Sequence, residues 1–354
     1  MRTYALPAVL VLYGITAYAD VGGVTIWSDS ASLGPSAAAE GDAYRFINVD
    51  DVALTTQETT ITLTYPERVS FDTMYGFDVK KAGPPVTVAF VPDTAYNWSG
   101  YLPYRVGAFE VSVRGKKVDD ALIQGPRKVG DGDDAAFVFP IDFGAAGRCD
   151  VRVAYSYVLK EEAAFVDLSR KRGDLLGLEY SLAPAQYWAG GVERVGISVV
   201  LEGADVSDLG RISPWGFKFV PNGVRWEWRY VTDELLREGY DNGGLGVAVF
   251  FGAPTDLNND VTTVLADGGL TVRAGGGTLY DPLAVLPKGA RLYVYAGGIE
   301  GGRISVYNAG SVSHWLRCRT FDNVEGYVCN DVGGEYYLDS YDANKAAFPE
   351  EGSE

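Results

Sequence analysis

Histidine is nearly absent from this chain, because His314 is the only one among its 354 residues. Ser-His-acid triads and Cys-His pairs require an imidazole as general base, and many zinc sites use several histidines as ligands. Cys149 could find a histidine partner only if distant parts of the chain meet, and we expect His314 to be a solvated strand residue. The sequence therefore excludes those classes of hydrolase for the larger, N-terminal part of the chain.

Cysteine is scarce as well, since three residues are too few for a scaffold built on disulfides. Cys318 and Cys329 flank a turn-like stretch, residues 322–326, between two strand-like runs. Side chains that face each other across a hairpin come close together, so we expect these two to form a disulfide. The alternative is a pair of independent buried thiols. Cys149 is expected to be a free, partly buried thiol.

Basic residues are outnumbered, with 30 Lys and Arg against 47 Asp and Glu and a net charge of −17. Binding to nucleic acid or anionic lipid depends on clustered Lys and Arg, so we expect neither partner. The acidic turns Asp131–Asp134 and Asp256–Asp260 lack the glycine and glutamate that a helical calcium hand needs. We interpret them as solvated turns, and we expect neither a metal nor a cofactor.

Long hydrophobic runs are missing too, and we expect no membrane span, which would need roughly 20 apolar residues. Residues 1–19 have the features of a secretory signal peptide instead. Arg2 precedes a short apolar core from Leu6 to Ile15, and Ala17-Tyr18-Ala19 forms a small-x-small cleavage site. We therefore predict an exported protein, periplasmic or secreted, that begins after cleavage following Ala19.

Alternation of apolar and polar residues dominates the rest of the chain, with turn residues at short intervals. This pattern predicts an all-β protein with an antiparallel β-sandwich over residues 20–253 and a linker at 254–263. A short helix is expected at 232–238, and the acidic tail 341–354 is expected to fray. The expected strands are 60–65, 85–91, 109–114, 136–139, 151–157, 196–201, 224–230 and 245–250.

The C-terminal segment carries an ordered set of motifs. They are Leu270, Val272 and Arg273 of a strand, Gly275, the turn residues Leu286, Lys288 and Gly289, then Trp315, Gly326 and a final Tyr337-Leu338. In this order they resemble the bacterial SH3-like domain, at residues 264–340. Tyr327 stands where that family usually has Trp, and segment 296–313 is longer than usual. The resemblance implies a small barrel that binds cell-wall peptides or glycans.

Aromatic side chains near the expected groove could stack on sugar or peptide faces. These candidate ligand-binding residues are Tyr280, Tyr293, Tyr295, Trp315 and Tyr327. The alternative is that the rings fill the core of a small barrel. Residues 85–250 loosely resemble uncharacterised bacterial envelope proteins, and that likeness implies no activity.

The favoured hypothesis is a non-catalytic, exported binding protein of the bacterial envelope whose SH3-like domain engages peptidoglycan or a wall-associated protein. The first alternative is a secreted carbohydrate-active enzyme with paired carboxylates, because such an enzyme needs no histidine. Glu227 is its most suggestive residue, since alternation directs it away from Trp226 and Trp228. The second alternative is a structural assembly module. Further carboxylate candidates are Glu179, Glu193, Asp233 and Glu234.

Overall fold

A computed structural model describes residues 24–27, 33–38, 44–46, 50–64, 68–90, 94–97, 100–101, 106–128, 135–158, 176–182, 188–231, 246–251, 261–295, 303–308 and 311–339. The signal segment, both acidic turns, the expected helix at 232–238 and the tail 341–354 lie outside these residues. Within them, helical structure is limited to two 3-10 turns, η2 (Asp120–Leu122) and η4 (Val206–Asp208). The predicted all-β fold is confirmed.

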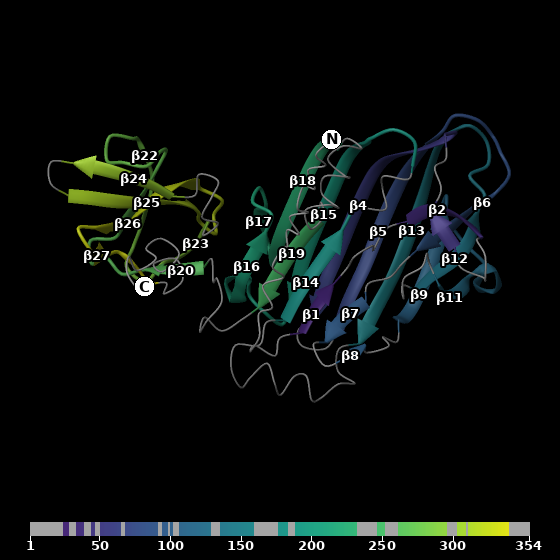
Figure 1. The fold of residues 1–354 in the computed structure, drawn as a ribbon, viewed down its shortest axis with the longest axis horizontal. Coiled ribbons are helices and arrows are strands. Elements are labelled where there is room, and N and C mark those ends of the chain that lie inside the picture. The colour runs from purple at the N-terminus through teal and green to yellow at the C-terminus, as the bar shows by residue number, and fades with distance from the viewer. Residues whose placement is uncertain are drawn as a thin grey trace, which may run out of the picture.

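An eight-stranded sheet forms one layer of the N-terminal part (Figure 1). Every strand predicted for the N-terminal part, whether in this sheet or in the two described below, overlaps an observed strand. In spatial order this sheet contains β10 (Lys116–Lys117), β9 (Val106–Val113), β13 (Gly147–Val158), β5 (Arg68–Val79), β4 (Val52–Thr64), β15 (Val192–Glu202), β18 (Gly223–Val231) and β17 (Lys218–Val220).

Two further sheets make up the opposite layer. The six-stranded one contains β16 (Leu209–Ser213), β19 (Gly246–Phe251), β14 (Leu176–Ser181), β1 (Val24–Trp27), β7 (Thr94–Asn97) and β8 (Gly100–Tyr101). The five-stranded one contains β11 (Gln124–Lys128), β12 (Ala135–Ile141), β6 (Val86–Phe90), β2 (Leu33–Ala38) and β3 (Tyr44–Phe46).

The expectation of an antiparallel sandwich needs one correction. Most neighbouring strands are antiparallel, but β15 pairs with β4 in parallel from Arg194↔Thr56 to Glu202↔Thr64, and β1 pairs with β14 in parallel. Parallel neighbours require a long crossover between them, and alternation within each strand carries no information about strand direction. This mixed topology could not be deduced from the pattern.

Aromatic and branched side chains fill the space between the layers. Phe90 of β6 packs edge-on against Tyr155 of β13 with the ring centroids 5.2 Å apart, which joins the five-stranded sheet to the eight-stranded one. Trp226 of β18 is 1% exposed, and its indole nitrogen donates to the carbonyl of Pro214 at 2.9 Å. Glu227 points to the opposite face, as predicted from the alternation.

The C-terminal residues form a separate, nine-stranded sheet with its own core, which we call the C-terminal sheet (Figure 1). Its first strand begins at Val261, inside the segment expected to be a linker. The strands are β20 (Val261–Val264), β21 (Leu270–Arg273), β22 (Pro282–Leu286), β23 (Arg291–Val294), β24 (Arg303–Asn308), β25 (Ser311–Arg319), β26 (Glu325–Val332), β27 (Glu335–Tyr336) and β28 (Leu338–Asp339).

The start of β18 depends on a glycine. A Cβ atom on Gly223 would lie 2.0 Å from the backbone oxygen of Val199, which cannot move independently of strand β15. Gly223→Ala is therefore expected to lower the free energy of unfolding by about 1–3 kcal/mol, as other overpacking changes do. Urea denaturation followed by tryptophan fluorescence measures this loss.

Gly83→Ala is the matched control, because a Cβ there meets nothing within 4 Å. Its free energy of unfolding should stay within about 0.5 kcal/mol of the wild type. Equal stabilities for the two variants would contradict the packing at Gly223.

Candidate functional site

Two of the aromatic residues predicted to bind ligand lie against the sandwich. Strand β16 ends at Ser213, and the chain turns through Pro214 and Gly216 before β17. Gly216 has φ 109°, a backbone conformation that glycine adopts without strain. This turn directs the ring of Trp215 at the C-terminal sheet, where it lies 5.9 Å from Tyr293 and 5.4 Å from Tyr295.

Tyr293 is fixed by hydrogen bonds as well as by packing. Its ring is 1% exposed and meets Phe217 edge-on with a centroid distance of 5.0 Å. Its hydroxyl accepts from the backbone nitrogen of Ile212 at 2.9 Å and donates to the backbone oxygen of the same residue at 2.6 Å. Because the hydroxyl both donates and accepts, Tyr293 links the C-terminal sheet to strand β16 of the sandwich through two hydrogen bonds.

Cationic side chains cover the Trp215 ring. The guanidinium carbons of Arg317 and Arg319 lie 5.0 Å and 5.1 Å from its centroid, within the range of cation–π attraction. The indole nitrogen of Trp215 donates to Glu325 Oε1 at 3.1 Å, and Arg319 donates to Glu325 Oε2 at 2.6 Å. Arg317 also donates to Glu325, so one carboxylate accepts from three side chains.

The pKa values follow from this arrangement. Burial lowers the pKa of Arg319, and the Glu325 carboxylate partly offsets that effect. Burial alone would raise the pKa of Glu325, but hydrogen bonds from Arg317 and Trp215 and the two guanidinium charges hold it below its usual value. A carboxylate with a lowered pKa stabilises the fold above its unfolded-state pKa and loses that effect as the pH falls.

A further pair of bonds closes the contact. The side-chain amide of Asn323 accepts from the backbone nitrogen of Phe219 at 2.7 Å and donates to the backbone oxygen of Phe219 at 2.8 Å. Asn323 has φ 65° in the turn between β25 and β26, a conformation that asparagine tolerates well. We call the set formed by Trp215, Tyr293, Asn323, Arg319 and Glu325 the docking contact.

The other three predicted ligand residues are not members of the docking contact. Trp315 is 4% exposed, and its indole nitrogen donates to the hydroxyl of Ser313 at 3.1 Å within the core of the C-terminal sheet. Tyr327 is half-buried against the same core. Tyr280 is exposed and lies over Gly275, since a Cβ on that glycine would come within 2.6 Å of the Tyr280 ring.

Exposed apolar side chains lie close to Tyr280 in the sequence. Leu279 is 98% exposed and precedes it in the glycine-rich loop, and Leu283 and Val285 project outward from β22. Strand β22 ends the strand order of the C-terminal sheet, where it pairs with β21. We call Leu279, Tyr280, Leu283 and Val285 the edge patch.

The cysteines do not form the expected bridge. Cys318 lies opposite Gly326 and Cys329 lies opposite Trp315, so the hairpin register offsets the two residues. The hairpin turn is centred on Asp322, whereas a direct pairing of Cys318 with Cys329 would need a turn centred between Asn323 and Val324. All three cysteines are buried free thiols. Desolvation by burial raises the pKa of Cys318 to about 12 and that of Cys329 to about 11.

His314 is less solvated than expected, because its Nδ1 atom lies 2.9 Å from a carboxylate oxygen of buried Asp331. No group of three or more His, Cys, Asp or Glu side chains that could hold a metal occurs among the described residues. In the same part of the chain no helix is long and apolar enough to cross a membrane.

Of the carboxylates considered for catalysis, Glu227 lies on the outer face of the eight-stranded sheet, near Glu58. Glu58 forms ion pairs with Arg194 and, at 3.1 Å, with Arg225, and Glu227 lies 4.0 Å from Arg194. Gly196 permits this arrangement, since a Cβ there would clash with the Glu58 carboxylate. Asp233 and Glu234 lie outside the described residues, as does the side chain of Glu179, while Glu193 is exposed.

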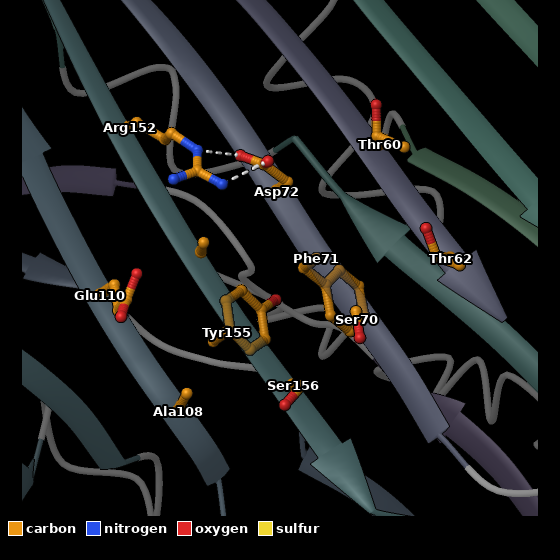
Figure 2. A pocket seen from close by; sticks show the side chains of 11 residues that line it. Thr60, Thr62, Ser70, Phe71, Asp72, Ala108, Glu110, Arg152, Tyr155 and Ser156 are labelled. Carbon is orange, nitrogen blue, oxygen red and sulfur yellow. Dashed lines mark hydrogen bonds and ion pairs between the residues drawn. The ribbon is translucent and has the colours of Figure 1, made fainter. Parts of the chain in front are cut away.

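A hollow of about 330 Å³ lies further along the same outer face, over β4, β5, β9 and β13 (Figure 2). Asp72 and Arg152 form a bidentate ion pair at its rim, with both N–O distances 2.7 Å. Small side chains make up its floor, and Glu110 lines it from β9. Nothing in the alternating pattern marked this hollow, because its residues read as the ordinary polar side of four strands.

The comparisons with known proteins give no family. No protein-family model matches the chain, and no curated protein matches it. Among solved structures, a candidate nutrient binding protein from Legionella pneumophila has a TM-score of 0.44 at 11% identity, covering 66% of this chain and 73% of that one.

A variant of the M1 zinc metallopeptidase from Deinococcus radiodurans has a TM-score of 0.32 at 10% identity, covering 75% of this chain and 52% of that one. Scores this low establish neither a shared fold nor an activity, so the function has to be argued from the chain itself.

The docking contact generates a stability prediction. Trp215→Ala removes the ring that the two arginines cover and leaves Glu325 with one donor fewer. We expect the free energy of unfolding to fall by about 2–3 kcal/mol, somewhat less than for a fully buried tryptophan. Calorimetry should then show the C-terminal sheet melting separately from the sandwich. Tyr307→Ala, which truncates an aromatic residue that is 78% exposed, should leave the single transition unchanged.

The buried thiols generate a second prediction. Because the thiolate is the reactive form, raised pKa values at Cys318 and Cys329 leave almost no reactive species at pH 8. Iodoacetamide should leave both unmodified in the folded protein and alkylate them in guanidinium without added reductant, as intact mass and peptide mapping would show. Alkylation that requires a reductant would contradict the free thiols.

Proposed function

We propose that the chain is an exported, non-catalytic binding protein of the bacterial envelope. In this proposal the C-terminal sheet is the SH3-like domain at residues 264–340, which follows a sandwich domain at 20–253 and engages peptidoglycan or a wall-associated protein. The signal segment at residues 1–19 supports export, and the motif order from Leu270 to Leu338 supports the domain. The docking contact would present this domain in a fixed orientation.

The edge patch is the observation that carries the proposal. Eight of the eleven large apolar side chains exposed among the described residues belong to the C-terminal sheet, and four of these form the edge patch. Exposed apolar side chains grouped in this way mark interaction sites on soluble proteins. A tyrosine ring flanked by aliphatic side chains suits the face of a sugar ring or an apolar peptide side chain.

Tyr280 is accordingly the sequence-predicted residue that we retain as a ligand contact. Tyr293 and Trp315 are buried, so a ligand would have to displace structure to reach them, and the half-buried Tyr295 is already in edge-on contact with Trp215. Tyr327 could take part only at the margin, because it is half-buried between Arg273 and Arg317 in the sheet register.

A carbohydrate-active enzyme finds less support. A glycosidase needs two carboxyl groups facing across a cleft, one acting as an acid. Glu58 and Glu227 instead share Arg194 on an open sheet face, and Asp72 binds Arg152 through both oxygens. Carboxylates held by guanidinium groups suit an ordered surface better than proton transfer.

Co-sedimentation of the full mature chain with protein-stripped peptidoglycan sacculi tests the proposal. Leu279→Ser and Tyr280→Ala should each lower the pelleted fraction at least fivefold, because they remove the apolar contact while changing exposed side chains. Leu122→Ser is the control, since Leu122 is also exposed but lies in the sandwich.

If wild type pellets and both variants pellet equally, the edge patch is not the binding surface. If the wild type neither pellets nor captures a protein from wall extracts through the edge patch, the envelope-binding proposal fails. Sedimentation equilibrium decides the assembly alternative, because a structural module would form defined oligomers that Leu279→Ser leaves intact.

A further inference from the structure

The hollow on the outer face of the eight-stranded sheet has a floor of small side chains. Alternation along β5 and β13 turns Phe71 and Tyr155 into the core, where their rings stack with centroids 4.6 Å apart. The residues next to Phe71 and Tyr155 along each strand point outward, and where these are small the outer surface of the sheet is hollowed (Figure 2). The outward side chains at the floor are Thr60, Thr62, Ser70, Ala108, Ala154 and Ser156.

Four hydroxyl groups are therefore gathered on neighbouring strands. Thr60 and Thr62 come from β4, Ser70 from β5 and Ser156 from β13. Each hydroxyl can donate one hydrogen bond and accept two, so the floor offers both functions over its whole width. Ala108 and Ala154 leave space in the hollow and have no side-chain polar group that needs a hydrogen-bond partner. Such a floor matches a ligand that also carries many hydroxyl groups.

The rim supplies oriented charged groups. Asp72 binds the Nε and Nη2 atoms of Arg152, which fixes the plane of the guanidinium group before any ligand arrives. The hydrogen bonds to Asp72 and the charge of that carboxylate raise the pKa of Arg152, and the nearby charge of Glu110 adds to this effect. A group held in place in this way loses little entropy on binding.

The charges also limit the ligand. Two carboxylates and one guanidinium give the rim a net negative charge, and the chain as a whole has a net charge of −17. This net negative charge would repel an anionic ligand, whereas an uncharged ligand meets no such repulsion. A volume of about 330 Å³ is at the small end of ligand sites, which span roughly 300–1,000 Å³.

We infer that this hollow is a binding site for a short, uncharged saccharide, with Arg152 and Glu110 as the orienting donor and acceptor. The site is on the sandwich, apart from the edge patch, and its argument does not depend on wall binding by the C-terminal sheet. In this inference the sandwich binds a ligand different from that of the C-terminal sheet.

Titration calorimetry on the full mature chain tests the inference, with chitotriose and maltotriose as neutral probes and trigalacturonate as the anionic one. We expect at least one neutral trisaccharide to bind saturably. Ala154→Leu, which fills the floor, should weaken its Kd at least tenfold. Ala145→Leu makes the same change at an exposed loop position outside the hollow and should leave the Kd unaltered.

Glu110→Gln gives a second test that keeps the shape of the rim. Loss of the charged acceptor should weaken the Kd about tenfold, the usual cost of a hydrogen bond to a charged group. Leu279→Ser, which changes the edge patch, should leave the Kd unchanged and so separates this inference from the proposed wall binding.

Three results would overturn the inference. They are the absence of saturable binding for both neutral probes, tighter binding of trigalacturonate than of either neutral probe, and unchanged affinity in both Ala154→Leu and Glu110→Gln. Urea denaturation of each variant establishes that the altered proteins remain folded.

Discussion

The packing of Trp215 against side chains of the C-terminal sheet holds that sheet to the sandwich and so determines which surfaces stay exposed. A tryptophan covered by two guanidinium groups, with Glu325 accepting from both arginines and from its indole nitrogen, joins apolar burial to charge-assisted hydrogen bonds. Tyr293 and Asn323 add bonds to backbone atoms, which side-chain motion cannot easily break. The contact therefore ties the two parts of the chain through both core and backbone.

Docking removes one surface from ligand binding and leaves two others open. Tyr293 is buried and Tyr295 is half-buried against Trp215, while the edge patch and the outer face of the eight-stranded sheet are exposed. An apolar patch suits a wall component or a protein, and a hydroxyl-lined hollow suits a neutral polar ligand. With the parts held together, two chemically different surfaces would be carried in a fixed relation.

Much of the fold could be predicted from the sequence, and the site could be predicted only in part. Alternation located eight strands of the N-terminal part, though not the central strand β5, and placed Glu227 opposite Trp226, because side-chain direction is a local property. It could not reveal that β4 and β15 run parallel or that Cys318 and Cys329 are out of register, because pairing is a relation between segments. Trp215 and Phe219 were not singled out from the sequence, because their partners Glu325 and Asn323 lie about a hundred residues further along the chain.

The most direct test of this account is a measurement of residual dipolar couplings for backbone amides in the full mature chain. If the docking contact holds, couplings from the eight-stranded sheet and from the C-terminal sheet will fit one common alignment tensor, and Trp215→Ala will split them into two. Two independent tensors in the wild-type protein would contradict the account, because the C-terminal sheet would then be a freely tethered module with Tyr293 and Tyr295 open to ligand.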